Sequence, residues 1–243
     1  MEITRTPSRM ESDGPFLIKQ WEDFGGLNIS STTGLADWQV TETNASSTEL
    51  LSATLSGGVL VLTDEGTEDN VIDISANAGV RVDTLKAGAP VKFQARFKTA
   101  DADQMDIHIG LNIKDASMVA GAAADYVMFR SQDASAALDL VISKDSATTE
   151  VLNFITLADD TWCHVEFEFV PDATTPDLGA VKYRAITNGT VVSGSVPAAG
   201  NFADDVVLFM DVQAQLGEAA ANATSIDYMG LEYTLPALAS TAG

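Results

Sequence analysis

Short segments with strand-like alternation recur along most of this chain, and they constrain its fold more than any other feature. At least twelve stand between turns rich in Gly, Asp, Asn, Ser and Thr. They occupy residues 57–64, 70–75, 90–99, 105–114, 125–131, 138–144, 150–157, 161–170, 180–187, 190–196, 205–215 and 224–233. Two Ala-rich stretches, 116–126 and 215–224, are short and interrupted by Gly or Asn, so we expect loops there. The pattern predicts an all-β fold built as an antiparallel two-sheet sandwich.

The segment at 161–170, TWCHVEFEFV, shows the alternation most clearly. Side chains of a strand point alternately to opposite faces, so His164, Glu166 and Glu168 should share one face. Phe167 and the only cysteine, Cys163, fall on the other face. We expect a solvated face on the first side and core packing on the second, with Cys163 acting as a small buried hydrophobe.

The chain is expected to form one domain, because all-β sandwiches often reach 243 residues as a single unit. Residues 1–15 lack periodicity and are predicted as an extended N-terminal arm, with the sandwich at 16–234 and a tail at 235–243. Within the sandwich, Asn188 and Gly189 separate two strand segments. Both residue types tolerate the positive φ of a type I′ turn, so 180–187 and 190–196 should pair as a hairpin.

Charge and hydropathy exclude several classes of function. The chain carries 13 Lys and Arg against 35 Asp and Glu, a net charge of −22, which argues against binding to phosphate backbones of nucleic acids. No apolar run approaches the roughly 18 residues that a membrane helix needs. The polar first fifteen residues predict no signal peptide.

Several motifs together resemble those of concanavalin A-like and laminin-G-like jelly-roll domains. They are W-x-H-V at 162–165, the alternating strand after it, the hairpin around 188–189, the D-F-G-G stretch at 23–26 and the closing strand at 224–233. The resemblance covers residues 16–234 and implies a jelly-roll sandwich. Since such sandwiches carry unrelated functions, the fold alone does not assign an activity.

A second resemblance concerns four short stretches of the sequence. FQARFK, IGLNIKDAS, DYVMFRS and GEAAANATSIDYMGLEY are similar to stretches of jelly-roll structural proteins of tailed bacteriophages, especially those of marine hosts. It implies a non-enzymatic virion protein, a capsid decoration or head-fibre subunit made in the host cytoplasm. Such a subunit would contact the major capsid protein or other virion proteins and form a homo-oligomer, for which we expect a trimer. The arm, through Arg5, Arg9 and Phe16, would be its docking element.

The alternative hypothesis is a glycan-binding, lectin-like module on a virion or cell surface. We expect no cofactor, with calcium at Asp101, Asp103 and Asp106 as the alternative, because hard cations prefer several carboxylate oxygens. A hydrolase using Glu166 and Glu168 is disfavoured. Related enzymes carry an E-x-D-x-E strand, and the nearest match, VIDIS at 71–75, lacks both glutamates. The three tryptophans are assigned to the core.

Overall fold

The structure is a computed structural model and describes residues 9–12, 17–24, 38–42, 48–51, 58–64, 66, 68–82, 89–114, 124–132, 134–217 and 220–235. In these ranges the chain forms two antiparallel sheets, and η2 (Pro176–Leu178) is a 3₁₀ turn. The predicted all-β, two-sheet jelly-roll sandwich is confirmed. In the same ranges, no helix has the length and apolarity required to cross a bilayer.

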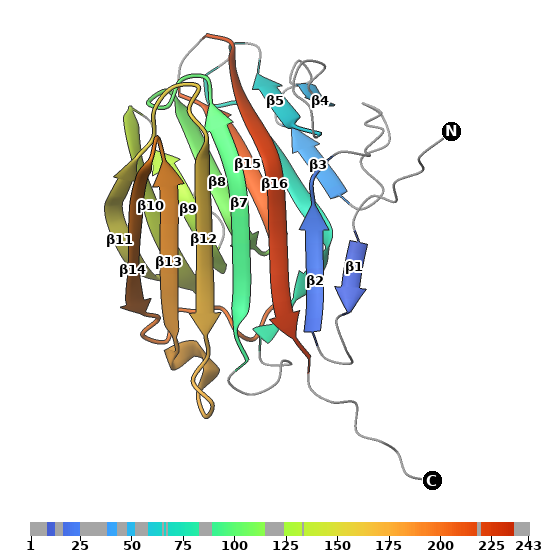
Figure 1. Cartoon of the computed structure of the whole chain (residues 1–243), viewed down its shortest axis with the longest axis vertical. Helices are drawn as coiled ribbons and strands as arrows, with labels where there is room; N and C mark the ends of the chain where they lie inside the picture. The colour runs from blue at the N-terminus through green and yellow to red at the C-terminus, as the bar shows by residue number, and fades with distance from the viewer. Residues whose placement is uncertain are drawn as a thin grey trace.

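Sheet A has nine strands. Seven follow the order β1-β2-β16-β7-β12-β13-β14, and β5 and β4 continue from the N-terminal half of β16. Figure 1 shows this sheet toward the viewer, from β14 on the left to β1 on the right. The strands are β1 (Arg9–Ser12), β2 (Leu17–Glu22), β4 (Thr48–Leu51), β5 (Leu60–Asp64), β7 (Val91–Thr99), β12 (Cys163–Val170), β13 (Ala180–Thr187), β14 (Thr190–Pro197) and β16 (Asn222–Thr234).

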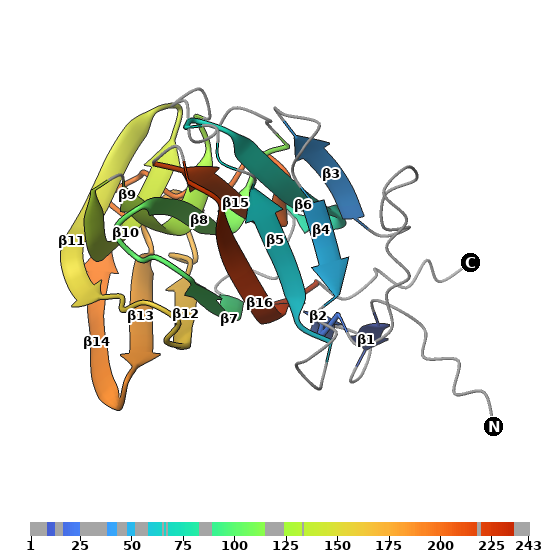
Figure 2. The same cartoon turned by 90° about the horizontal axis from the view of Figure 1, so that it is seen from above.

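Sheet B has seven strands in the order β11-β10-β9-β8-β15-β6-β3 and lies behind sheet A in the view of Figure 1. Seen from above, the two sheets form two layers (Figure 2). The strands are β3 (Trp38–Glu42), β6 (Val71–Val80), β8 (Met105–Asn112), β9 (Tyr126–Gln132), β10 (Ser135–Lys144), β11 (Ala147–Thr156) and β15 (Leu208–Leu216).

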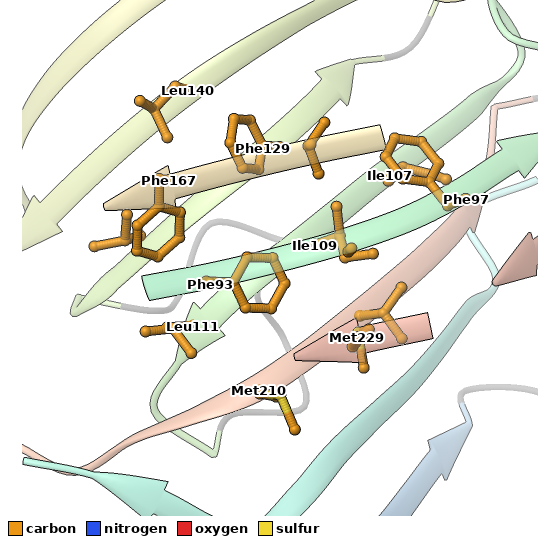
Figure 3. Packing of buried hydrophobic residues seen from close by; sticks show 14 of the residues in the cluster. Phe93, Phe97, Ile107, Ile109, Leu111, Phe129, Leu140, Phe167, Met210 and Met229 are labelled. Atoms are coloured by element: carbon orange, nitrogen blue, oxygen red, sulfur yellow. The ribbon is translucent and has the colours of Figure 1, made fainter. Parts of the chain in front are cut away.

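The hydrophobic core lies between the inner faces of the two sheets. Phe93 of β7 and Phe167 of β12 stack with ring centroids 5.5 Å apart, and Phe129 of β9 meets Phe167 from sheet B at 6.1 Å (Figure 3). Burying each ring contributes roughly 1.5 to 3 kcal/mol to stability. The predicted inward face of 161–170 is confirmed, and Cys163 is fully buried, which raises the pKa of its thiol to about 12.

The hairpin predicted at Asn188-Gly189 is also confirmed. Both residues have positive φ, 47° and 75°, and β13 and β14 pair along their whole length from Thr187–Thr190 onward. This turn fixes the register of the two outermost strands on one side of sheet A. It therefore determines which side chains of β13 and β14 face solvent beside β12.

All twelve predicted strand segments coincide with strands β5 to β16, whereas β1 to β4 were not singled out. These four strands have only four to six residues each, too few for a clear period of two. Within the predicted arm, residues 9–12 form β1, which pairs antiparallel with β2 of the same chain. The remainder of the arm and residues 236–243 of the predicted tail lie outside the described residues.

Candidate functional site

A groove with a volume of about 790 Å³ lies on the outer face of sheet A. Its walls come from β2, β16, β7, β12, β13 and β14, which lie side by side in Figure 1. The volume falls within the roughly 300 to 1,000 Å³ of typical ligand sites. The sequence analysis predicted a solvated face here but no groove.

Strand register brings the groove residues into two rows that run across the strands. The first row is Lys19, Glu232, Lys92, Glu168, Lys182 and Ser195. The second is Trp21, Gly230, Gln94, Glu166, Arg184 and Ser193. Because cross-strand neighbours lie about 5 Å apart, each side chain can contact the next one in its row. Charge alternates in sign along the whole of the first row up to Ser195.

Ion pairs fix the charged side chains of both rows. Glu168 lies 2.9 Å from Lys182 and 3.5 Å from Lys92, and Glu166 lies 3.3 Å from Arg184. The hydrogen bond from Lys182, helped by Lys92, holds the pKa of Glu168 below its usual value although burial opposes this. Glu168 is therefore an ionised acceptor and not a proton donor.

The aromatic end of the groove is formed by Trp21. Its indole stacks on Tyr228 with ring centroids 4.9 Å apart and planes 22° apart. It also lies against Gly230, where an added Cβ would be 2.6 Å from Cε3 of the indole. A glycine at this position lets the ring lie flat on the sheet. Trp21 nevertheless remains 43% exposed, the largest exposed aromatic side chain among the described residues.

A chain of side-chain contacts from Tyr228 through His164 to Glu166 adjoins the groove and supports Tyr228. The Tyr228 hydroxyl lies 2.7 Å from Nδ1 of His164, whose Nε2 lies 3.4 Å from Glu166. Burial raises the pKa of Tyr228, so its hydroxyl stays protonated near neutral pH. These contacts thus link Tyr228, at the aromatic end of the groove, to Glu166 at its charged end. They hold the ring beneath Trp21 in place.

The predicted outward direction of His164, Glu166 and Glu168 is confirmed. Their ion pairs argue against the acid and base of a glycosidase. One carboxyl of such a pair must keep its proton near neutral pH, which requires a raised pKa. The ammonium groups beside Glu168 have the opposite effect, and Glu166 is paired with Arg184. The arrangement is suited to binding hydroxyl and ionic groups.

The calcium site at Asp101, Asp103 and Asp106, which was the alternative to no cofactor, stays a prediction. Asp101 and Asp103 are hydrogen-bonded to each other, which raises the pKa of Asp101, while Asp106 lies in β8 opposite Gln215 on the outer face of sheet B. Across the described ranges, no three His, Cys, Asp or Glu side chains are placed to hold a metal ion. Asp101 and Asp103 thus lie together in the loop, while Asp106 lies on a strand.

The residues predicted for docking are largely outside the described part of the chain. Arg5 and Phe16 are not described, and Arg9 is described only by its backbone, which pairs with Trp21 in β1 and β2. This pairing places Arg9 at the end of the second groove row. The docking role itself stays a prediction.

The core assignment of the three tryptophans was right for Trp38 and wrong for Trp21, and Trp162 is only half-buried, with the Arg96 guanidinium 4.6 Å from its ring centroid. Trp38 is 2% exposed and its Nε1 donates to the buried carboxylate of Glu22 at 3.4 Å. In β2 the polar Gln20 and Glu22 point inward, so Trp21 points outward with Lys19. Once LIKQWE is known to be a strand, Trp21 and Lys19 must share one face, although six residues are too few to show this period clearly. This weak signal was the one available for Trp21 in the sequence.

Sheet B also carries polar residues on its outer face, but they are buried. Asp73 and Asp211 are 3% and 1% exposed, and Nδ2 of Asn112 donates to Asp211 at 2.6 Å. Burial, with the adjacent Asp73 carboxyl, raises the pKa of Asp211 well above its usual value. Beside them, burial and Arg130 lower the pKa of His108 to about 4. Asp73, Asp211 and Asn112 are thus enclosed, whereas the groove on sheet A is open.

No protein-family model and no curated protein matches the sequence. Among solved structures, a protein of unknown function from Shewanella oneidensis MR-1 matches with a TM-score of 0.65 at 18% identity, covering 96% of this chain and 93% of that one. Winged bean acidic lectin, solved with methyl-α-D-galactose, matches with a TM-score of 0.60 at 11% identity, covering 90% and 99%.

An endo-β-1,4-glucuronan lyase from the fungus Trichoderma reesei matches with a TM-score of 0.53 at 13% identity, covering 79% of this chain and 89% of that one. The fold is therefore shared by lectins and by at least one enzyme. At identities this low, the comparisons show architecture and not activity. The chain has the concanavalin A-like jelly-roll fold found in legume lectins.

Proposed function

We propose that this protein is a non-enzymatic glycan-binding module and that its ligand lies in the groove on the outer face of sheet A. The observation that carries this proposal is the position of Trp21. The indole lies flat over Gly230, is stacked on Tyr228 and stays 43% exposed. A flat, rigid aromatic surface is what the C–H groups on one face of a sugar ring pack against.

The polar rows beside Trp21 supply the hydrogen bonds that a sugar requires. Gln94 has both donors and acceptors, Glu166 accepts, and Arg184 donates. Because Glu166 and Arg184 already hold each other at 3.3 Å, little side-chain entropy remains to be lost on binding. Ser193 and Ser195 add hydroxyl groups at the outer end of the groove. The groove combines one apolar platform with convergent polar groups, as ligand sites commonly do.

The lectin neighbours support this proposal through their shared fold, one of them having been solved with a galactoside. The virion role expected from the sequence stays a prediction, as do the capsid-protein contact, the trimer and the location on a capsid surface. None of the neighbours named above is described as a virion protein. Glycan binding is compatible with either a virion or a cellular surface.

The proposal is tested by screening wild-type protein on a glycan array and measuring each hit by isothermal titration calorimetry. Trp21→Ala should weaken binding at least about tenfold, corresponding to roughly 1.4 kcal/mol. Trp21→Phe should retain most of the affinity because it keeps a flat ring.

The matched control is Leu152→Ala, which removes another exposed apolar side chain, 57% exposed on β11 of sheet B. It should bind as the wild type does. If every glycan is blank, or if Trp21→Ala binds with unchanged affinity, the proposed site is wrong.

A further inference from the structure

Positive charge is concentrated on the face that holds the groove. The described strands β2, β16, β7, β12, β13 and β14 carry six of the chain's 13 Lys and Arg on their outer face, against four of its 35 Asp and Glu. The rest of the chain has seven cationic side chains against 31 acidic ones. The groove face is thus slightly cationic on a protein with a net charge of −22.

The groove cations have more donors than partners. Glu168 is shared by two ammonium groups, Lys182 at 2.9 Å and Lys92 at 3.5 Å. Each ammonium group has three donors, so one carboxylate does not satisfy both. The side chains of Lys182 and Lys92 are 62% and 46% exposed, and that of Arg184 is 42% exposed. Some of the donors on these three side chains are therefore left open to solvent at the groove.

Long-range repulsion from the rest of the protein does not cancel this local excess. At physiological ionic strength the Debye length is about 8 Å, which is less than two strand spacings. A group bound within the groove therefore interacts mainly with Lys92, Lys182, Arg184 and their carboxylate partners. Acidic loops elsewhere on the molecule are screened.

We infer, building on the proposed glycan site, that the groove selects acidic glycans whose sugar rings carry carboxylate groups, such as uronic acids. One sugar ring stacks on Trp21, and carboxylates along the chain are bound by Lys92, Lys182 and Arg184. The planar guanidinium of Arg184 suits a planar carboxylate, which accepts two parallel hydrogen bonds. Glu166 and Glu168 accept from the sugar hydroxyls and oppose a second anion at the same place.

The test uses three acidic glycans, polygalacturonate, polyglucuronate and alginate oligosaccharides, each paired with the same oligosaccharide after its carboxyl groups are reduced to alcohols. Binding is measured by calorimetry at about 0.15 M NaCl, near physiological ionic strength. We expect at least one acidic member to bind about tenfold or more tightly than its reduced partner. A glycan that carries sulfate groups but no carboxylates is included in the same series. It separates a requirement for carboxylates from a general preference for anions.

The variant Lys92→Gln/Lys182→Gln should lower affinity for the acidic member about tenfold and affinity for the reduced member by a much smaller factor. Lys114→Gln is the matched control, because Lys114 is exposed and bonds Asn77 at 2.7 Å on the sheet B side. It removes a positive charge at a distance from the groove and should change neither affinity.

The outcomes separate the two proposals. Equal binding of acidic and reduced members, tighter binding of the sulfated glycan, or binding only of neutral glycans would overturn the preference for carboxylates but not glycan binding. Absence of binding to every glycan, acidic or neutral, would overturn both proposals. Binding of the acidic member that is unaffected by the double variant would place the anion site elsewhere and overturn this inference.

Discussion

The Trp21 indole and the Tyr228 ring are stacked with centroids 4.9 Å apart, and they come from neighbouring strands β2 and β16 of sheet A. Tyr228 is itself fixed by the contact of its hydroxyl with His164 at 2.7 Å. An exposed aromatic side chain is thus held by a ring that cannot easily move. The relationship gives the groove a preformed platform and makes its geometry sensitive to small changes beneath it.

Gly230→Ala should displace this platform. The new Cβ would lie 2.6 Å from Cε3 and 2.9 Å from Cζ3 of Trp21, well inside the roughly 3.5 Å of a normal carbon contact. The indole must tilt away, so we expect glycan affinity to fall about tenfold and stability by about 1 kcal/mol. Calorimetric titration and urea unfolding measure the two effects.

Gly189→Ala is the control for that variant. It should also cost about 1 kcal/mol, because φ at Gly189 is 75°, but an added Cβ there meets no atom within 4 Å. Glycan affinity should not change. A Gly230→Ala protein that binds as the wild type does would mean that the Trp21 platform is not part of the site.

His108 should make the protein less stable as the pH falls below 6.5. Burial and Arg130 lower its pKa to about 4, so the folded state keeps it neutral while the unfolded state takes up a proton near pH 6.5. Its contribution is complete above pH 6.5 and is lost progressively toward pH 4, with about 2 kcal/mol lost by pH 5. Urea unfolding of wild type and His108→Gln at pH 7 and pH 5 measures this. Equal pH dependence in both proteins would contradict the prediction.

Asp211→Asn should stabilise the protein at neutral pH. The raised pKa of Asp211 means that the unfolded state releases its proton above about pH 4 while the folded state retains it, so stability falls as the pH rises between the two values. Asparagine cannot ionise beside Asp73 and can still accept from Asn112, which donates at 2.6 Å. We expect a gain of about 1 kcal/mol or more by urea unfolding at pH 7.

Asp139→Asn is the contrasting variant. Asp139 accepts from the Asn153 N–H at 2.7 Å and lies 3.9 Å from Arg130, so it is a buried carboxylate with a cationic neighbour. Its neutralisation should destabilise the fold, the opposite sign to Asp211→Asn. If both variants change stability in the same direction, the account of the buried carboxyl pair is wrong.

Lys144→Met should destabilise the fold by about 2 to 3 kcal/mol. The ammonium group lies 2.6 Å from Asp204 and 3.3 Å from Asp177, joining the end of β10 to η2 and to the loop before β15. Burial alone would lower the pKa of Lys144, but these carboxylates raise it above its usual value. Removing the cation leaves the carboxylates facing one another. Lys182→Met, at an exposed pair, should cost at most about 0.5 kcal/mol in the same urea experiment.

The sandwich was predictable from the sequence because strands β5 to β16 carry a clear alternation or a tight turn signal such as Asn188-Gly189. The groove was less predictable from the sequence. Glu166 and Glu168 were correctly placed on an outer face, but their neighbours Lys182 and Lys92 come from strands whose pairing no local pattern specifies. Trp21 was assigned to the core because β2 is short and buries polar residues, which conceals its alternation.

The most direct test of the groove is a ¹H–¹⁵N spectrum of the indole N–H groups during titration with the tightest glycan found. The chain has three tryptophans, and Trp21→Phe and Trp162→Phe assign their signals. Trp38 is buried in the core and serves as an internal reference. The account predicts that the Trp21 signal shifts with ligand and saturates at the calorimetric Kd, while the Trp38 signal stays unchanged. Saturable binding with a stationary Trp21 signal would contradict it.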